Sequence, residues 1–306
     1  MSKPSIVVIG SSNTDMVIKT GHLPGPGETI LGGTFLMNPG GKGANQAVAA
    51  ARMGGNIIFI CKTGADVFGK QSARLLQEEG IDTSLLISDP ALPSGVALIT
   101  VDKNGENCIV VASGANANLS SSDLLPALQV ISESSLVLMQ LEIPLETVSY
   151  VASFSFENNI PVILNPAPAC ALPDILLRNI SILTPNKTEA EMLTGIRIDD
   201  IPSAKQAAQK IKGRGVKTVI ITLGSKGALV FDKNVFTEIP ALSVTAVDTT
   251  AAGDTFNGSL VVALSEGKNI IEATKYACKA SAISVTRIGA QASIPFKWEV
   301  DAFEVN

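Results

Sequence analysis

The amino-acid sequence predicts a doubly wound α/β fold, in which a mostly parallel sheet carries helices on both faces. Two observations lead to this prediction: short β-branched runs alternate along the chain with longer amphipathic stretches, and nearly all of the short runs are apolar throughout. A strand without polar positions is buried on both of its faces, which is the situation in a parallel sheet that helices cover on both sides.

Taken in order, strands are predicted at residues 5–9, 57–61, 136–140, 161–165, 180–184 and 218–222. Helices are predicted at residues 44–53, 67–79, 145–158, 204–212 and 259–266. Because the sequence contains no internal repeat or low-complexity linker, residues 1–306 are predicted to form one main domain.

Two segments, residues 21–38 and 94–112, break this alternation. They are rich in Gly, Pro and alternating residues, and the DKNG sequence that starts at Asp102 places a turn between two strand-like runs. We expect these segments to form antiparallel strands outside the main sheet. Ligands of an open α/β sheet bind beyond the C-terminal ends of its strands, so a small β flap near that edge would act as a lid.

Composition and charge exclude several classes of protein. Hydrophobic residues make up 46% of the chain and charged residues 17%, which is ordinary globular usage and excludes disorder. The 23 basic and 28 acidic residues leave a net charge of −5, so no global basic field draws the chain to nucleic acid or to an anionic membrane. The only histidine, His22, excludes a His-rich metal site. An anionic ligand must therefore be held by local groups.

The predicted location is the cytoplasm. The four cysteines stand far apart with no C-x-x-C pair, which favours a reduced setting. The apolar run at residues 6–9 is too short for the core of a signal peptide, and no stretch reaches the roughly 18 apolar residues of a membrane helix.

The strongest local signal is the sequence VDTTAAGDTFNG at residues 247–258, which leads into a predicted helix. Small residues, among them Ala252 and Gly253, leave the first backbone N–H groups of that helix open to a ligand, and the helix dipole favours an anion there. Asp254 lies just inside this anion site. A carboxylate beside a phosphate is repelled unless it has a use, such as taking a proton from a hydroxyl that attacks phosphorus. An ordinary acidic first turn of a helix is the open alternative.

Polar side chains near three predicted strand ends could bind a polyol. Asn13 and Asp15 follow the first predicted strand directly and are expected at its C-terminal edge, and Glu142 ends another apolar run. A glycine turn that feeds a helix of small residues brings Lys42 and Asn45 within reach of hydroxyl groups. Plain turns explain each segment taken alone.

Two kinds of segment are candidates for holding a nucleotide. Residues 64–70 have the G-x-x-x-x-G-K spacing of a P-loop, but Gln71 replaces the Ser or Thr that holds magnesium, so we interpret them as a turn and a helix start. Residues 222–227 (TLGSKG) and 184–189 (TPNKTE) fit better, because each follows a predicted strand. In the latter, Asn186 and Glu189 could hold magnesium-bound water, and a capping box is the open alternative.

These strings, in this order, resemble the ribokinase-like family of carbohydrate kinases. The resemblance covers nearly the whole chain, from residues 10–15 to residues 286–291, and residues 248–258 are its most specific part. It implies ATP-dependent phosphorylation of a sugar at its primary hydroxyl, with D-ribose, giving ribose 5-phosphate and ADP, as the leading hypothesis. It also implies that Asp254 is the base and that the backbone around Ala252 and Gly253 is the anion hole.

The resemblance implies three further sets of site residues. The sugar-contacting positions would be Asn13, Asp15, Gly41, Lys42, Gly43, Asn45, Glu142 and Asp254. The nucleotide and its Mg²⁺ would be held by Asn186, Glu189, Thr222, Gly224, Ser225, Gly227, Gly253 and Cys278. A monovalent cation, K⁺, would lie among Asp248, Thr250, Ser284, Arg287, Gly289 and Ser293, mostly on carbonyl oxygens.

The same resemblance implies that the lid strands pair across a homodimer. Two residues depart from the family pattern. Lys187 stands where the family often has Glu, and Cys278 stands where a polar residue commonly contacts the nucleotide. Both departures concern the nucleotide donor and not the reaction.

Several alternatives stay open beside this hypothesis. Another sugar or nucleoside kinase would share the same fold, although aromatic residues at 4% of the chain offer no evident slot for stacking a base. A non-catalytic sugar sensor would most simply have lost Asp254 or the glycine before it, and both are present. A dinucleotide-dependent dehydrogenase is disfavoured because no G-x-G-x-x-G follows the first predicted strand.

Overall fold

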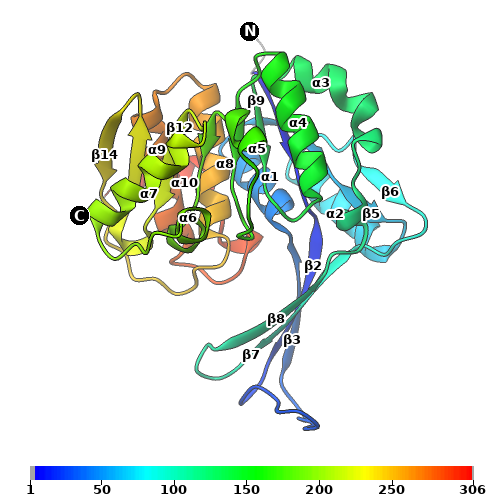
Figure 1. Ribbon diagram of the computed structural model, residues 1–306. Coiled ribbons are helices and arrows are strands. Elements are labelled where there is room, and N and C mark those ends of the chain that lie inside the picture. The colour runs from blue at the N-terminus through cyan, green and yellow to red at the C-terminus, as the bar shows by residue number, and fades with distance from the viewer. Residues whose placement is uncertain (1–3, 305–306) are drawn as a thin grey trace.

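An eight-stranded sheet forms the centre of the protein in the computed structural model, which describes residues 4–304 (Figure 1). The strand order is β14-β13-β12-β11-β10-β9-β1-β4. The run from β12 to β4 is parallel throughout and comprises β1 (Ser5–Ile9), β4 (Asn56–Ile60), β9 (Leu136–Met139), β10 (Val162–Leu164), β11 (Ile182–Leu183) and β12 (Thr218–Thr222). An antiparallel hairpin extends the sheet at one edge through β13 (Ala228–Asp232) and β14 (Val235–Ile239).

Helices cover both faces of this sheet. One face packs against α1 (Lys42–Arg52), α8 (Ala252–Ser265), α9 (Ile270–Ser284) and α10 (Lys297–Ala302). The other packs against α3 (Leu128–Ser132), α4 (Leu145–Glu157), α5 (Asp174–Arg178), α6 (Lys187–Thr194) and α7 (Ile201–Gly213). The remaining helical segments are α2 (Val67–Glu78) and the 3-10 turns Gly114–Asn118, Ser122–Ala127, Gly224–Lys226 and Gln291–Ser293. No helix within residues 4–304 has the length and apolar character needed to cross a membrane.

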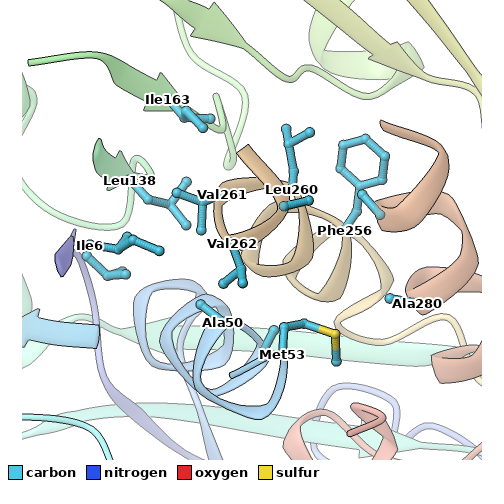
Figure 2. Packing of buried hydrophobic residues seen from close by; sticks show 14 of the residues in the cluster. Ile6, Ala50, Met53, Leu138, Ile163, Phe256, Leu260, Val261, Val262 and Ala280 are labelled. Atoms are coloured by element: carbon cyan, nitrogen blue, oxygen red, sulfur yellow. The ribbon is translucent and has the colours of Figure 1, made fainter. Parts of the chain in front are cut away.

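Successive residues of β1 divide between these two layers. Ile6 and Val8 belong to the apolar cluster completed by α1 and α8, whereas Val7 and Ile9 belong to the cluster on the opposite face. Figure 2 shows the first cluster, in which strand residues such as Leu138 point toward Val261 of α8. The predicted doubly wound fold, with its mostly parallel sheet, is therefore confirmed.

Most predicted elements lie within two or three residues of the observed ones. The largest difference among the helices is α8, which begins at Ala252 rather than at residue 259, so the segment of small residues forms its first turns. β13, β14 and α9 were not predicted from the sequence. The β13–β14 hairpin is an edge feature, and α9 (IIEATKYACKASAIS) mixes small and apolar residues on most of its faces, which weakens its helical period.

A second, four-stranded sheet projects from the body (Figure 1). We call it the lid sheet, and its strands in spatial order are β3 (Thr34–Gly40), β2 (Asn13–Lys19), β7 (Gly95–Val101) and β8 (Asn107–Ala112). The pairs β2·β3 and β7·β8 are antiparallel, and the parallel pair β2·β7 joins them. A two-stranded sheet of β5 (Lys62–Gly64) and β6 (Ile87–Asp89) lies in the body.

The lid sheet matches one of the two segments singled out from the sequence and differs from the other. β7 and β8 lie within residues 94–112, as expected. The other pair uses residues 13–19 and 34–40 rather than 21–38, and residues 20–33 form the connection between those strands. Asn13 and Asp15 therefore lie in a lid strand and not in a loop at the edge of the main sheet, because the chain leaves β1 through Ser11 and Ser12 straight into β2. The hairpin of β7 and β8 turns at Asp102, whose backbone N–H bonds the carbonyl of Glu106.

Candidate active site

Asp254 is buried in the first turn of α8 with both carboxylate oxygens hydrogen-bonded from α1. Asn45 Nδ2 donates to Oδ2 at 3.0 Å, and Gln46 Nε2 donates to Oδ1 at 2.9 Å. Burial raises the pKa of Asp254, against the opposing effects of Lys42 and of these two amide donors. A carboxylate whose proton affinity is increased while its position is fixed is suited to accept a proton.

The backbone at the start of α8 is open to a ligand. Ala251, the N-cap residue, has a left-handed conformation with φ of 58°, which is strained for a residue with a side chain, and no side chain caps the helix. Within residues 4–304 the N–H groups of Gly253 and Asp254 have no hydrogen-bond acceptor. Open space surrounds Gly253, since a Cβ built there would meet no atom within 4 Å. These two N–H groups can bind an anion.

A cavity of about 670 Å³ adjoins this helix start. Seven residues predicted for the nucleotide or the anion hole line it together: Thr222, Gly224, Ser225, Gly227, Ala252, Gly253 and Cys278. Gly227 has φ of 90°, and a Cβ there would come within 2.0 Å of the carbonyl oxygen of Ile239, so only glycine permits this turn. Residues from three segments that are far apart in the sequence thus line one cavity.

Other lining residues of this cavity were missed by sequence reasoning. They include Leu242, Val244, Phe256, Ser281 and Val285. These side chains are small or apolar, and all but Phe256 lie outside the motifs described above. Only their position in the fold identifies them as cavity lining. Their apolar character suits the flat ring of a base, in agreement with the site expected for a nucleotide.

The sugar-contacting candidates meet where β1 and β9 end and where β2 and α1 begin. Glu142 Oε2 accepts hydrogen bonds from Ser11 Oγ at 2.5 Å and from the backbone N–H of Lys42 at 2.9 Å. The carboxyl group of Asp15 packs on Gly40, where a Cβ would lie 2.3 Å from Oδ2. Burial, together with the charges of Glu142 and Asp254, raises the pKa of Asp15 to about 6.

Two further features mark this end of the site as a place for hydroxyl groups. Asn45 Oδ1 is buried and has no hydrogen-bond partner in the described chain, so it lacks the donor that a buried acceptor requires. Asn13 and Glu142 line a second cavity of about 480 Å³. A ligand hydroxyl at Asn45 would supply the missing donor.

Asn116 is a residue of this region that sequence reasoning missed. Its Nδ2 donates to Asn13 Oδ1 at 2.8 Å and its Oδ1 accepts from the N–H of Ser12 at 2.9 Å. It is buried in a 3-10 turn of sequence GANAN, which carries no recognisable signal. Asn116 holds Asn13 at the base of the lid sheet.

Asn186 and Glu189 form the capping box that was the alternative interpretation of this pair. Asn186 Oδ1 accepts from the N–H of Glu189, and the two Glu189 carboxylate oxygens accept from the backbone and side-chain N–H groups of Asn186, each at 2.8 Å. Burial raises the pKa of Glu189, and Asp254 and Lys42 are near enough to influence it. The pair therefore faces the same site. Among residues 4–304 no three His, Cys, Asp or Glu side chains form a cluster of direct metal ligands.

Asp248 links two of the segments expected around a monovalent cation. Its Oδ1 accepts from the N–H and Oγ1 of Thr250, and its Oδ2 accepts from the N–H of Gly289 at 2.9 Å. Although burial alone would raise it, these hydrogen bonds hold the pKa of Asp248 below its ordinary value.

The side chains of the other three cation candidates are turned to local partners. Ser284 and Ser293 donate to the carbonyl oxygens of Ser281 and Ala290, and Arg287 pairs with Glu299. Their backbone carbonyl oxygens are therefore the groups that could serve as ligands.

The P-loop-like segment takes no part in this site. Asp66 caps α2 by accepting from the N–H of Gly69, and it also accepts from the N–H and Oγ of Ser94. The interpretation as a turn and a helix start is confirmed.

Comparisons with known proteins identify the family of the chain. The model of the pfkB family carbohydrate kinases matches residues 3–297. A ribokinase of Haemophilus influenzae is 46% identical over 98% of this chain and 98% of its own length, and a deoxyribokinase of Salmonella typhi is 38% identical over 95% of each. The structure of Arabidopsis thaliana ribokinase complexed with ribose and ATP superimposes with a TM-score of 0.91, at 33% identity, over 99% of this chain and 100% of that chain.

Proposed function

The chain belongs to the pfkB family of carbohydrate kinases, and from that premise we propose that it phosphorylates D-ribose at its primary hydroxyl, with ATP as the donor. The products are ribose 5-phosphate and ADP. The observation that carries this proposal is the position of a buried carboxylate, Asp254, beside two unpaired N–H groups at the edge of a nucleotide-sized cavity.

Asp254 accepts the proton of the sugar hydroxyl as that oxygen attacks the γ-phosphorus of ATP. The bond from phosphorus to the oxygen that bridges to ADP breaks, and ADP leaves with that electron pair. Charge develops on the phosphoryl oxygens during transfer, and the N–H groups of Gly253 and Asp254 stabilise it because they are already oriented and unpaired. The proton that Asp254 gains is retained until product release.

The sugar is oriented by carboxylate and amide groups from the lid sheet and the body. Asp15 and Asn13 approach from β2, and Asn45 approaches from α1 with its free Oδ1. Glu142 fixes the backbone of the glycine turn of Gly41, Lys42 and Gly43 by accepting the N–H of Lys42. The lid sheet closes over the sugar in this proposal and excludes water, which protects the phosphoryl group from hydrolysis.

Asn186 and Glu189 would hold the magnesium ion that accompanies ATP, through bound water. The donor set fits a hard divalent cation, because each Glu189 oxygen keeps a lone pair beyond its bond from Asn186 and Glu189 forms no ion pair within residues 4–304. When bound, the ion would neutralise part of the negative charge of the phosphate groups.

The turn at Asp248 would hold K⁺ together with carbonyl oxygens of Thr250, Ser284, Arg287, Gly289 and Ser293. The ionised Asp248 fits a cation, and the turn leads directly to the strained residue Ala251. The ion would hold this turn in one conformation and thereby fix the N–H groups of Gly253 and Asp254, which form the anion hole. Initial rates in potassium chloride should exceed those in choline chloride of equal ionic strength, and equal rates would leave Asp248 as a turn cap.

The lid sheet would also pair with that of a second copy of the chain, and the location would be the cytoplasm. Large apolar side chains are exposed on its strands, including Phe35 at 59%, Leu98 at 56% and Val110 at 62%. A contiguous apolar surface of this kind is typical of an interface.

A coupled assay of ADP release with ribose, 2-deoxyribose, fructose and adenosine tests the proposed substrate. We expect the highest kcat/KM for ribose. A higher value for 2-deoxyribose would assign the chain to deoxyribose phosphorylation, and a higher value for adenosine would make it a nucleoside kinase. Sugar binding without ADP release in any reaction would favour the non-catalytic sensor.

A further inference from the structure

A chain of buried amide and hydroxyl groups lies behind Asp254, and none of its members belongs to the sugar, nucleotide or cation sets described above. Its members come from α1, the ends of three central strands and α8, and all are nearly inaccessible to solvent: Gln46, Gln140, Asn165, Thr184 and Asn257. Buried polar groups of this kind are costly unless they are paired. Their pairing is therefore informative.

Gln46 is fully paired in one orientation. Its Nε2 donates to Asp254 Oδ1 at 2.9 Å and to Asn165 Oδ1 at 3.0 Å, and its Oε1 accepts from Gln140 Nε2 at 2.6 Å. A reversed amide would turn its oxygen toward two acceptors, so the neighbours fix its direction. Each Asp254 oxygen accepts one hydrogen bond, Oδ1 from Gln46 and Oδ2 from Asn45, so each keeps a lone pair for a substrate hydroxyl.

The series of hydrogen bonds continues from Gln46 through Asn165, Thr184 and Asn257 to the anion hole. Asn165 Nδ2 donates to the carbonyl oxygen of Thr184 at 3.2 Å, and Thr184 Oγ1 donates to Asn257 Oδ1 at 2.7 Å. Asn257 Nδ2 then donates to the carbonyl oxygen of Gly253 at 2.8 Å. The links start at the Asp254 carboxylate and return to the residue that precedes it.

We propose that Gln46 is a positioning residue of the phosphoryl transfer, which holds the Asp254 carboxylate in register with the anion hole through Asn165, Thr184 and Asn257. The proposal deepens the proposed function and rests on it for the role of Asp254. Gln46 acts through Asp254 and does not touch the substrate. This series of hydrogen bonds holds the carboxylate of Asp254 and the N–H groups of the anion hole in a fixed relative position. The attacking oxygen and the phosphoryl group therefore keep their alignment.

The electrostatic surroundings give Gln46 a measurable signature. Asp254 is faced by Lys42 from α1, by Glu142 beyond β9, and by Asp15 of β2 and Glu189 of α6. Burial raises the pKa of Asp254, and the hydrogen bond from Gln46 is among the few interactions that lower it. Removing that donor destabilises the charged carboxylate, so the pKa of Asp254 rises further and the base is ionised only at higher pH.

The test is Gln46→Met, which keeps nearly the same volume. We expect kcat to fall about 30-fold to 100-fold while the KM values for sugar and ATP change by less than about threefold, because alignment is lost and binding is not. The acid limb of kcat against pH should move upward by about one pH unit. The carboxyl titration of Asp254 by infrared difference spectroscopy, assigned with Asp254→Asn, should move in the same direction.

Two matched variants separate positioning from structure. Ser155→Ala removes a fully buried hydroxyl on the opposite face of the sheet, one without a hydrogen-bond partner within residues 4–304, and should change neither kcat nor the titration. Thr184→Val breaks the link to Asn257 without touching Asp254, so it should lower kcat several-fold and leave the acid limb in place. If Gln46→Met does not fold, Gln46→Glu keeps the shape, replaces the donor by an acceptor and should also raise the Asp254 titration.

Two results would overturn the proposal. One is a folded Gln46 variant in which Asp254 titrates at the same pH as in the wild-type protein, and the other is a Gln46 variant whose kcat equals the wild-type value. The titration needs no sugar, so it tests the role of Gln46 even if the assay shows that ribose is not the acceptor.

Discussion

β1 of the central sheet and β8 of the lid sheet have nearly the same apolar sequence and opposite surroundings. β1 reads SIVVI, and its residues from Ile6 to Ile9 are fully buried. β8 reads NCIVVA, and Ile109, Val110 and Val111 are 53%, 62% and 49% exposed. The same local preference for extended structure thus produces a core strand where helices cover it and a bare strand where none do.

The two sheets also divide the proposed reaction between them. The body fixes Asp254, the open N–H groups of α8 and the nucleotide cavity, all on elements packed from both sides. The lid sheet carries Asp15, on strands with few covering groups. We therefore expect changes in the body to affect turnover and folding stability, and changes in the lid sheet to affect sugar binding.

The largest expected effect is that of Asp254→Asn in the body. Turnover should fall by about three orders of magnitude with ATP affinity nearly unchanged, because the amide keeps the shape but cannot accept the hydroxyl proton. Steady-state kinetics and nucleotide titration of the purified variant measure both. Retention of more than about a tenth of wild-type turnover would show that Asp254 is not the base.

Asp15→Ala in the lid sheet should act on sugar binding instead. Charge-assisted hydrogen bonds to sugar hydroxyls contribute about 1.5 to 3 kcal/mol, so the KM for sugar should rise roughly tenfold to 150-fold while the KM for ATP changes little. Asn38→Ala, at the residue paired with Asp15 in the neighbouring strand, is a control for disturbance of the lid sheet. Equal effects of Asp15→Ala on both substrates would make Asp15 a structural residue.

The substitution pair Val8→Ala and Val110→Ala compares the two strands directly. Removing buried methyl groups from β1 should lower the free energy of unfolding by about 2 kcal/mol, whereas Val110→Ala in a monomer should change it by less than about 0.5 kcal/mol. Chemical denaturation at several protein concentrations measures both. A large, concentration-dependent loss for Val110→Ala would indicate that a second copy covers the lid sheet, as proposed.

The pH dependence of sugar binding should follow Asp15. With a pKa raised to about 6 by burial and by Glu142 and Asp254, Asp15 is ionised above that pH and protonated below it. The proton removes an acceptor for sugar hydroxyls, so the dissociation constant of the sugar should rise about tenfold between about pH 7 and pH 5. Calorimetric titration across this range measures it. The Asp15→Asn variant should bind the sugar weakly, and its dissociation constant should not depend on pH in this range. If the variant kept the pH profile of the wild-type protein, Asp15 would be excluded as the titrating group.

Much of the fold and many of the site residues were predictable because they depend on short-range patterns. Apolar runs of strand length identified the parallel strands, and the small residues before Asp254 identified an open helix start. The motifs that resemble the kinase family also named seven residues that line the 670 Å³ cavity. Each of these signals lies within about a dozen neighbouring residues, where local geometry decides the outcome.

Other features depended on contacts between segments far apart in the chain. Three examples are hydrogen bonds that only the tertiary structure reveals. Asp248 accepts from the N–H of Gly289, and Asn116 donates to Asn13. Gln46 is linked to Gly253 through Asn165, Thr184 and Asn257. No local pattern marks these contacts, even for Asn257 and Gly253 inside the motif at residues 247–258, because an amide that pairs with a distant amide imposes no pattern on its own neighbours in sequence. The sequence by itself determined the parallel strands, most of the helices that cover them and the open turn before Asp254. Which of them are covered, and which polar groups meet, was decided by packing, since burial depends on what the rest of the chain places there.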